Sequence, residues 1–105
     1  MSNRKIETTV DTLIIALCLD YERRAAAILS RMAAKRTDTE FRYLNFNIFE
    51  ATAEIVGERY AEIYIKEIGK RTGYAKSKIT FVGEVQYKKN KRDIKDNVAK
   101  RLHLI

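Results

Sequence analysis

The sequence predicts an all-α fold, in which a long antiparallel helical hairpin is followed by a helix-turn-helix-like unit with a basic terminal helix. Composition is the first reason, because the 105 residues include no proline and only four glycines and are rich in residues that favour helices. The second reason is that apolar residues recur at intervals of three and four along most of the chain. A chain of this length supports one core. We therefore expect a single domain over residues 1–105, with the hairpin at 7–64 and the helix-turn-helix part at 65–105.

The first helical segment is predicted from about Glu7 to Arg36. Its apolar stripe is formed by Val10, Leu13, Ile14, Leu17, Tyr21, Ile28 and Met32. An unbroken helix of this extent would be ~45 Å long, which is longer than a compact domain of this size is wide. It must therefore belong to an elongated hairpin, be kinked, or pack on another subunit. Cys18 lies on the flank of the stripe and is expected to be a small packed hydrophobic residue.

The second helical segment is predicted to begin at residues 37–40, where Thr-Asp-Thr-Glu has the pattern of a capping box. Its apolar stripe continues to Ile68 and passes Gly57, at which the alternatives are a kink in the helix and a break between two helices. Glutamates form a row four residues apart on this segment, made of Glu50, Glu54, Glu58 and Glu62. Because only a few polar residues join the two segments, they should pack antiparallel and bring Arg23 and Arg24 near Glu50 and Glu54. A carboxylate metal centre would need histidine partners that the chain lacks, so we expect a solvated or salt-bridged face.

Residues 65–79 have the spacing of two short helices that cross at a tight turn. The inward positions are occupied by Ile65, Ile68 and Ile79. Gly69 stands where a small side chain would let the second helix approach, and Gly73 stands where the turn would need a positive φ. This stretch is therefore predicted to form a helix-turn-helix.

The second helix of this unit can be placed in two ways. In the first placement it starts near Ala75 and carries Lys76, Ser77 and Lys78 outward. In the second, residues 75–82 form an irregular or short helical connection, Gly83 precedes the helix, and the DNA-reading helix runs from Glu84 to His103. We prefer the second placement, because this last segment carries one narrow apolar stripe, formed by Tyr87, Ile94, Val98 and Leu102.

Positive charge is concentrated in the C-terminal part of the chain. The net charge is +7, of which residues 1–65 contribute −1, from nine Lys and Arg against ten Asp and Glu. Residues 66–105 contribute +8, from twelve Lys and Arg against four Asp and Glu. A basic excess gathered in one part of a helical protein is typical of a polyanion partner, and nucleic acid is the commonest. The alternative is a solubilising surface.

The candidate nucleic-acid contacts lie on the last helix and just before it. Four cations of the last helix spread over the face away from its apolar stripe, namely Lys88, Lys89, Arg92 and Lys95. Arg92 and Asn90 can make bidentate contacts with guanine and adenine, respectively, whereas lysines more often hold phosphate. Three cations before the helix would clamp the DNA backbone, namely Lys70, Arg71 and Lys76, and Lys78 joins them as an outward cation of the first placement.

Catalysis and metal binding find little support in the sequence. The chain has a single histidine, His103, and a single cysteine, so it offers no catalytic triad, Cys/His metal site or internal disulfide. It also has no glycine-rich phosphate loop and no dinucleotide fingerprint. We therefore expect neither an enzyme nor a bound cofactor or metal, and we expect His103 to be a helix-end residue.

The sequence also argues against a membrane partner. The apolar run from Leu13 to Leu19 is too short to span a bilayer, and Asp11 and Asp20 bracket it. It lacks the small-residue cleavage site of a signal peptide. Because the lone cysteine suits a reducing compartment, we expect a cytoplasmic protein.

Two stretches resemble a known class of regulators. Residues 67–79, EIGKRTGYAKSKI, resemble the helix-turn-helix core of sigma-factor region 4 and related bacterial regulators. Residues 85–94 and 97–102, VQYKKNKRDI and NVAKRL, are similar to the C-terminal helix of small sigma-like transcription regulators carried by phages and mobile elements of Gram-positive bacteria. The resemblance, over about 40 residues, implies a DNA-binding regulator whose basic helix beginning near Glu84 reads a promoter or operator. The chain departs from the usual pattern at residues 79–83, which add length between the turn and the reading helix.

The leading hypothesis is thus a regulator that binds double-stranded DNA and acts as a homodimer through its N-terminal helices or as a partner of RNA polymerase. A rival hypothesis is a helical adaptor whose hairpin binds a protein and whose basic helix adds only solubility. It rests on more aromatic surface than one stripe can bury, namely Tyr43, Phe46, Phe49 and Tyr60. RNA binding is a third hypothesis, which Lys and Arg content does not separate from DNA binding, although no aromatic stacking platform is evident.

Overall fold

The computed structural model describes residues 8–30 and 36–105, apart from the side chains of residues 36–38, and its regular elements there are all helices. In chain order these are α1 (Thr8–Leu19), α2 (Tyr21–Ser30), α3 (Arg36–Val56), α4 (Glu58–Gly69), the short 3-10 helix η1 (Tyr74–Lys76) and α5 (Glu84–Arg101). The predicted all-α class is confirmed. Glu7 and residues 31–35 of the first predicted segment, which include Met32, lie outside the described residues, and Arg36, its predicted end, begins α3 instead.

Each of the two long predicted segments is divided into two helices. The first breaks at Asp20, between α1 and α2, so the kink, one of the three alternatives considered for this segment, is present. The second breaks at Gly57, whose φ of 88° lies in the left-handed region that glycine adopts without steric cost. α3 begins at Arg36, close to the predicted start. The side chains of Thr37 and Asp38, which belong to the predicted capping box, lie outside the described residues.

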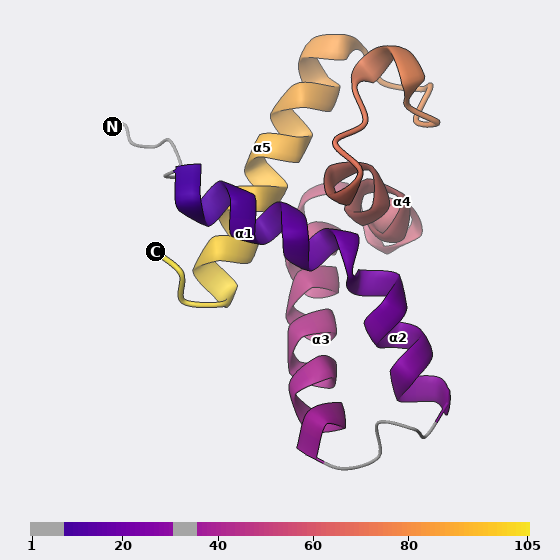
Figure 1. The fold of residues 1–105 in the computed structure, drawn as a ribbon. Coiled ribbons are helices and arrows are strands. Elements are labelled where there is room, and N and C mark those ends of the chain that lie inside the picture. The colour runs from indigo at the N-terminus through magenta and orange to yellow at the C-terminus, as the bar shows by residue number, and fades with distance from the viewer. Residues whose placement is uncertain (1–7, 31–35) are drawn as a thin grey trace.

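The other helices are arranged around α3. Figure 1 shows α2 running antiparallel to the N-terminal half of α3, with α5 and α4 packed toward its other end. α1 crosses the molecule and packs on α4 and α5. The predicted hairpin of two long helices is therefore present only as the shorter α2/α3 pair, because the chain turns at Asp20 and α1 packs on α4 and α5.

The core is made by one face of each helix except η1. Its fully buried side chains include Ile14 of α1, Ile48 of α3, Tyr64 and Ile65 of α4, and Tyr87, Ile94 and Val98 of α5. The inward positions predicted for Ile65, Ile68 and Ile79 are confirmed, since each is at most 2% exposed. The predicted apolar stripe of the last helix is also confirmed, with Leu102 packed against the core at its end.

Arg24 stabilises the break between α1 and α2. Its side chain is only 3% exposed. Its Nη2 donates to the carbonyl oxygen of Leu17 (2.6 Å), one of the last four residues of α1, whose carbonyls have no partner inside the helix. Its Nε donates to Asn45 Oδ1 of α3 (2.7 Å). The prediction that Arg23 and Arg24 lie near Glu50 and Glu54 is wrong, because Arg24 binds Asn45, while Arg23 pairs with Asp20 at 3.1 Å and lies over the ring of Phe41.

Gly69 allows a close approach, but the partner is α1. A Cβ atom on this glycine would lie 2.6 Å from the Cα atom of Leu19. No side chain fits at that distance, so the glycine is required where α4 crosses the end of α1. The prediction that it makes room for a reading helix is wrong.

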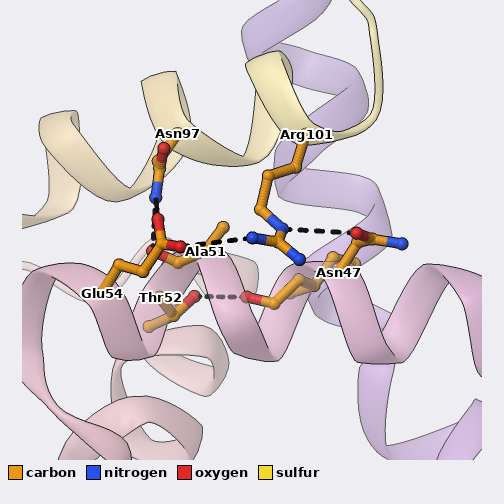
Figure 2. A network of polar contacts seen from close by, with 7 residues as sticks. Asn47, Ala51, Thr52, Glu54, Asn97 and Arg101 are labelled. Atoms are coloured by element: carbon orange, nitrogen blue, oxygen red, sulfur yellow. Dashed lines mark hydrogen bonds and ion pairs between the residues drawn. The ribbon is translucent and has the colours of Figure 1, made fainter.

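Polar contacts fix the C-terminal half of α5 on α3, as Figure 2 shows. The side-chain amide of Asn97 donates to the carbonyl oxygen of Ala51 (2.9 Å) and to Glu54 Oε1 (2.7 Å). Arg101 donates to Asn47 Oδ1 (3.3 Å) and pairs with Glu54 Oε2 (3.2 Å). The glutamate row is thus salt-bridged at Glu54, which is one of the two expected alternatives, a solvated or a salt-bridged face. Because α5 is anchored at this end, its N-terminal half extends beyond α3.

Two absences hold for the described part of the chain. No helix there is long and apolar enough to cross a membrane. Among the same residues, no group of three or more His, Cys, Asp and Glu side chains has the geometry to hold a metal ion.

Candidate nucleic-acid interface

The connection between α4 and α5 decides which placement of the second helix is realised. Residues 70–83 join the two helices and contain only the single turn of η1. A helix-turn-helix normally has a turn of about three or four residues. The first placement, with a helix starting near Ala75, is therefore wrong. The second placement gives the observed start, since Gly83 precedes α5 and the helix begins at Glu84.

α4 ends in a Schellman motif, with Arg71 at the position that usually holds glycine. The N–H of Thr72 donates to the carbonyl oxygen of Glu67 (2.9 Å), and the N–H of Arg71 donates to that of Ile68 (3.1 Å). Arg71 has a φ of 56°, whereas Gly73, predicted to take a positive φ, has −84°. The prediction for Gly73 is wrong because the turn reverses two residues earlier, at a residue with a side chain.

α5 ends in the same motif, with His103 in the left-handed conformation. Its φ is 60°, and the N–H of Leu104 donates to the carbonyl oxygen of Ala99 (2.8 Å). His103 is therefore a helix-end residue, as expected. Left-handed backbone costs a residue with a Cβ atom roughly 1–2 kcal/mol, so Arg71 and His103 are both held in a conformation that glycine would adopt more easily.

A buried carboxylate ties α4, the connection and α5 together. Glu67 is 6% exposed. Its Oε1 accepts hydrogen bonds from the hydroxyls of Ser77 (2.7 Å) and Tyr87 (2.7 Å), and its Oε2 accepts one from the N–H of Lys78 (2.8 Å). Burial alone would raise the pKa of Glu67, but these hydrogen bonds, together with the nearby positive charge of Lys91, outweigh it and lower the pKa from its ordinary value of 4.5.

Tyr87 is the residue of α5 that receives this support. Its side chain is fully buried, and its ring lies 5.9 Å from that of Tyr64 and 5.6 Å from that of Tyr74, measured between centroids. The same hydroxyl also lies 3.2 Å from the carbonyl oxygen of Thr72, so its single proton is shared between Glu67 and Thr72. Burial, followed by the hydrogen bond to Glu67, raises the pKa of Tyr87 to about 12. The first turn of α5 is therefore fixed in orientation relative to α4.

The outward face of this half of α5 is basic. The side chains of Lys88 and Lys89 are 66% and 54% exposed, and Arg92 is exposed as well. Lys88 pairs with Glu84 (2.9 Å) and Lys89 with Asp93 (2.7 Å), each one turn away along the helix. Exposed pairs of this kind contribute at most about 1 kcal/mol, so these cations can exchange their partners for a phosphate.

The four predicted cations of the connection are all on the surface. They are Lys70, Arg71, Lys76 and Lys78, and each is exposed. Lys70, Lys76 and Lys78 line one groove of about 400 Å³, together with Lys66 of α4. The same groove is also lined by Glu22 and Glu62, so its charge is mixed rather than purely positive.

Two predicted contacts of α5 are engaged inside the protein. The side-chain amide of Asn90 donates to the hydroxyl of Tyr64 (3.0 Å), and its Oδ1 accepts from Gln86 (2.7 Å). Lys95 is 23% exposed and pairs with Asp11 of α1 at 2.8 Å. A base contact by Asn90 would compete with both of its hydrogen bonds. These two residues therefore position α5 against α4 and α1, while Lys88, Lys89 and Arg92 face outward.

Sequence reasoning missed Lys91. Its Nζ donates to the carbonyl oxygen of Thr72 (2.6 Å) and lies 4.9 Å from the centroid of the Tyr87 ring. Burial, and then the charge of Lys95, lower the pKa of Lys91. The available signal was its place in the apolar stripe of α5, four residues after Tyr87 and three before Ile94.

Comparison with known proteins adds no family to this description. No protein-family model, curated protein or solved structure matches the chain.

Proposed function

We propose that the protein is a DNA-binding transcription regulator that contacts double-stranded DNA through the basic face of α5 and the basic connection before it. The observation that carries the proposal is the placement of Lys88, Lys89 and Arg92. They lie together on the exposed face of a half-helix whose opposite face is buried and fixed by Glu67 and Tyr87.

The dimensions of α5 suit a major groove. The groove is about 12 Å wide, and a helix with its side chains is about 10–12 Å across. The half of α5 that carries the three cations extends beyond α3, while Asn97 and Arg101 hold the other half against it. In this pose Arg92 is the side chain best able to make a bidentate contact with guanine, and the lysines meet phosphates.

The connection supplies the backbone contacts of this proposal. Lys70, Arg71, Lys76 and Lys78 are exposed between the end of α4 and the start of α5. In helix-turn-helix proteins the element before the reading helix meets the DNA backbone. The long connection replaces the tight turn, and Glu67 supplies the rigidity that the turn would otherwise give.

An exposed apolar face on the α2/α3 pair favours a second candidate, a protein contact. Leu29 is 83% exposed, Phe46 60% and Tyr43 51%. Leu29 and Phe46 line one groove with Ile28 and Phe49. Apolar surface gathered in this way marks protein contacts. In a regulator this face would hold a second copy or RNA polymerase, and in the adaptor alternative it would be the main functional surface.

The experiment that tests the proposal compares two triple variants in fluorescence anisotropy with a labelled duplex. The first changes Lys88, Lys89 and Arg92 to Ala. The second, a control that removes the same charge elsewhere, is Arg23→Ala, Arg59→Ala and Lys100→Ala, three exposed positions on α2, on α4 and in the last turn of α5. We expect the first variant to lose at least tenfold in affinity, since each charge-assisted contact is worth roughly 1.5–3 kcal/mol, while its helix content is unchanged.

The control variant should lose no more than about threefold, the part due to net charge alone. Equal losses in the two variants would mean that binding depends on total charge and not on this face. No binding of the wild-type chain to duplex DNA would refute the proposal, and retention of a protein partner by the first variant would favour the adaptor. A labelled RNA duplex measured in parallel decides the RNA alternative.

A further inference from the structure

A small cavity of about 250 Å³ opens between α1, the end of α4 and α5, beside the proposed DNA-binding face. Its polar lining is Arg71, Lys91, Lys95 and Asp11, together with Thr72 and Gly73. Three cations and one carboxylate therefore share one space. Charge of one sign, gathered in a concave site with apolar walls, raises the local concentration of oppositely charged ligands.

The two lysines are only partly neutralised within the protein. They lie one turn apart on α5, and like charges at that spacing repel each other. Lys91 uses one N–H on the carbonyl oxygen of Thr72 (2.6 Å), and Lys95 uses one on Asp11 (2.8 Å). Since a lysine ammonium has three donors, each retains donors for a further acceptor.

The nearby acidic groups do not cancel this charge. Asp11 is engaged by Lys95. Glu67 also acts on Lys91, but its own oxygens accept hydrogen bonds from Ser77, Lys78 and Tyr87. With both carboxylates counted against the three cations, a net charge of +1 remains in a partly buried space.

Arg71 provides a separate observation. It occupies the glycine position of the Schellman motif with a φ of 56°, a strained conformation for a residue with a Cβ atom, and it is one of the residues that line the cavity. Strain of this kind often marks functional sites. Arginine is also the side chain best suited to bidentate contact with phosphate oxygens.

We propose that this cavity binds a phosphate group, which Arg71, Lys91 and Lys95 hold through charge-assisted hydrogen bonds. The chemistry of the site does not depend on the source of the phosphate. Its assignment to a DNA backbone phosphate, at the edge of the basic face of α5, rests on the proposed function. In that case the site fixes the register of α5 on the duplex, since phosphate contacts position a reading helix without carrying sequence information.

The test is a titration of the full chain with sodium phosphate at constant ionic strength, followed by nitrogen-15 correlation NMR. Wild-type protein should show saturable shifts of the amides of residues 71–73, 91 and 95. Arg71→Gly and Lys91→Met should lose them, whereas His103→Gly and Lys100→Met should keep them. His103 has the same left-handed cap position, and Lys100 is an exposed lysine of the same helix. Because Arg71→Gly removes backbone strain, it should fold even if Lys91→Met does not.

The absence of a saturable shift, or equal shifts in Arg71→Gly and wild type, overturns the site. Binding to a labelled duplex separates the sources of phosphate. If the site holds a DNA phosphate, Arg71→Gly should lose about tenfold in affinity for the duplex. Its slope of log K against log salt should become shallower by about 1. The affinity and the slope of His103→Gly should be those of wild type. Unchanged DNA affinity alongside lost phosphate shifts supports a site for free phosphate compounds. Failure of wild type to bind DNA refutes the proposed function, while the phosphate titration still decides the site.

Discussion

Replacing Glu67 by glutamine removes one charge from the network that orients α5 and changes little else in shape. In the native protein Oε1 accepts from two hydroxyls and Oε2 accepts from the N–H of Lys78. A glutamine in the same pose keeps one oxygen and places an amide N–H₂ against a donor. If the amide faces Lys78, the partly buried backbone N–H of Lys78 is left without this acceptor. If the amide is flipped, Ser77 loses its acceptor and Tyr87 keeps only the longer contact with the carbonyl oxygen of Thr72.

The cost of Glu67→Gln follows from these contacts. Hydrogen bonds to a charged group contribute roughly 1.5–3 kcal/mol, and a buried donor without a partner costs roughly 1–3 kcal/mol. Since glutamine can keep part of the network, we expect a loss of about 3 kcal/mol in the free energy of unfolding. For a domain of this size, a change of 1 kcal/mol moves Tm by roughly 4–8 °C, so Tm should fall by roughly 12–24 °C.

Urea unfolding followed by circular dichroism measures this loss at pH 7. The matched control is Glu84→Gln, which neutralises an exposed glutamate whose only ion pair is with exposed Lys88 among the described residues and should cost at most about 1 kcal/mol. If Glu67→Gln costs no more than Glu84→Gln, the idea that Glu67 braces α5 is refuted.

The same variant predicts how stability depends on pH. The folded-state pKa of Glu67 is below its ordinary value of 4.5, so the charged carboxylate stabilises the folded protein above that pH. This contribution is lost as the pH falls below 4.5 through the folded-state pKa. The difference in stability between wild type and Glu67→Gln should therefore shrink in acid. A difference that stays constant from pH 7 to pH 3 would contradict the shift.

Two further predictions concern α1 and its contact with α4. Gly69→Ala places a Cβ atom 2.6 Å from the Leu19 backbone and should lower the free energy of unfolding in urea by about 1–3 kcal/mol or more. In the control Gly73→Ala, the added Cβ atom meets nothing within 4 Å, and stability should change by less than about 1 kcal/mol. Equal effects of the two variants would contradict the close approach. Burial raises the pKa of the Cys18 thiol to about 12. A thiol reagent should therefore react with the native protein at pH 8 only as fast as the protein unfolds. A reaction as fast as that of a denatured control would contradict the burial of Cys18.

The helices could be predicted where periodicity was strong and local. The start of α5 after Gly83 and its buried stripe followed from apolar spacing, because Tyr87, Ile94 and Val98 fall on one side of any helix drawn there. The break at Gly57 followed from glycine itself. The break at Asp20 left no such signal, since it is stabilised by Arg24, whose partner Asn45 lies far away in the sequence.

The candidate site was predictable in composition but not in pairing. Lys88, Lys89 and Arg92 were identified from charge and face alone, and they are exposed. The contact of Lys95 with Asp11 depends on where α1 folds back, which local patterns do not encode. The left-handed Arg71 was missed because the rule that places glycine at helix ends pointed to Gly73.

The most direct test of DNA binding by the outward face of α5 is the affinity of the wild-type chain for a duplex across a series of salt concentrations. Each phosphate neutralised by a lysine or arginine contributes about −0.9 to the slope of log K against log salt. With three cations on α5 and further ones in the connection, we expect a slope of about −3 or steeper, and the triple change of Lys88, Lys89 and Arg92 should make it shallower by about 2 to 3. Binding that is insensitive to salt, or a slope that the triple change leaves unaltered, would contradict the account.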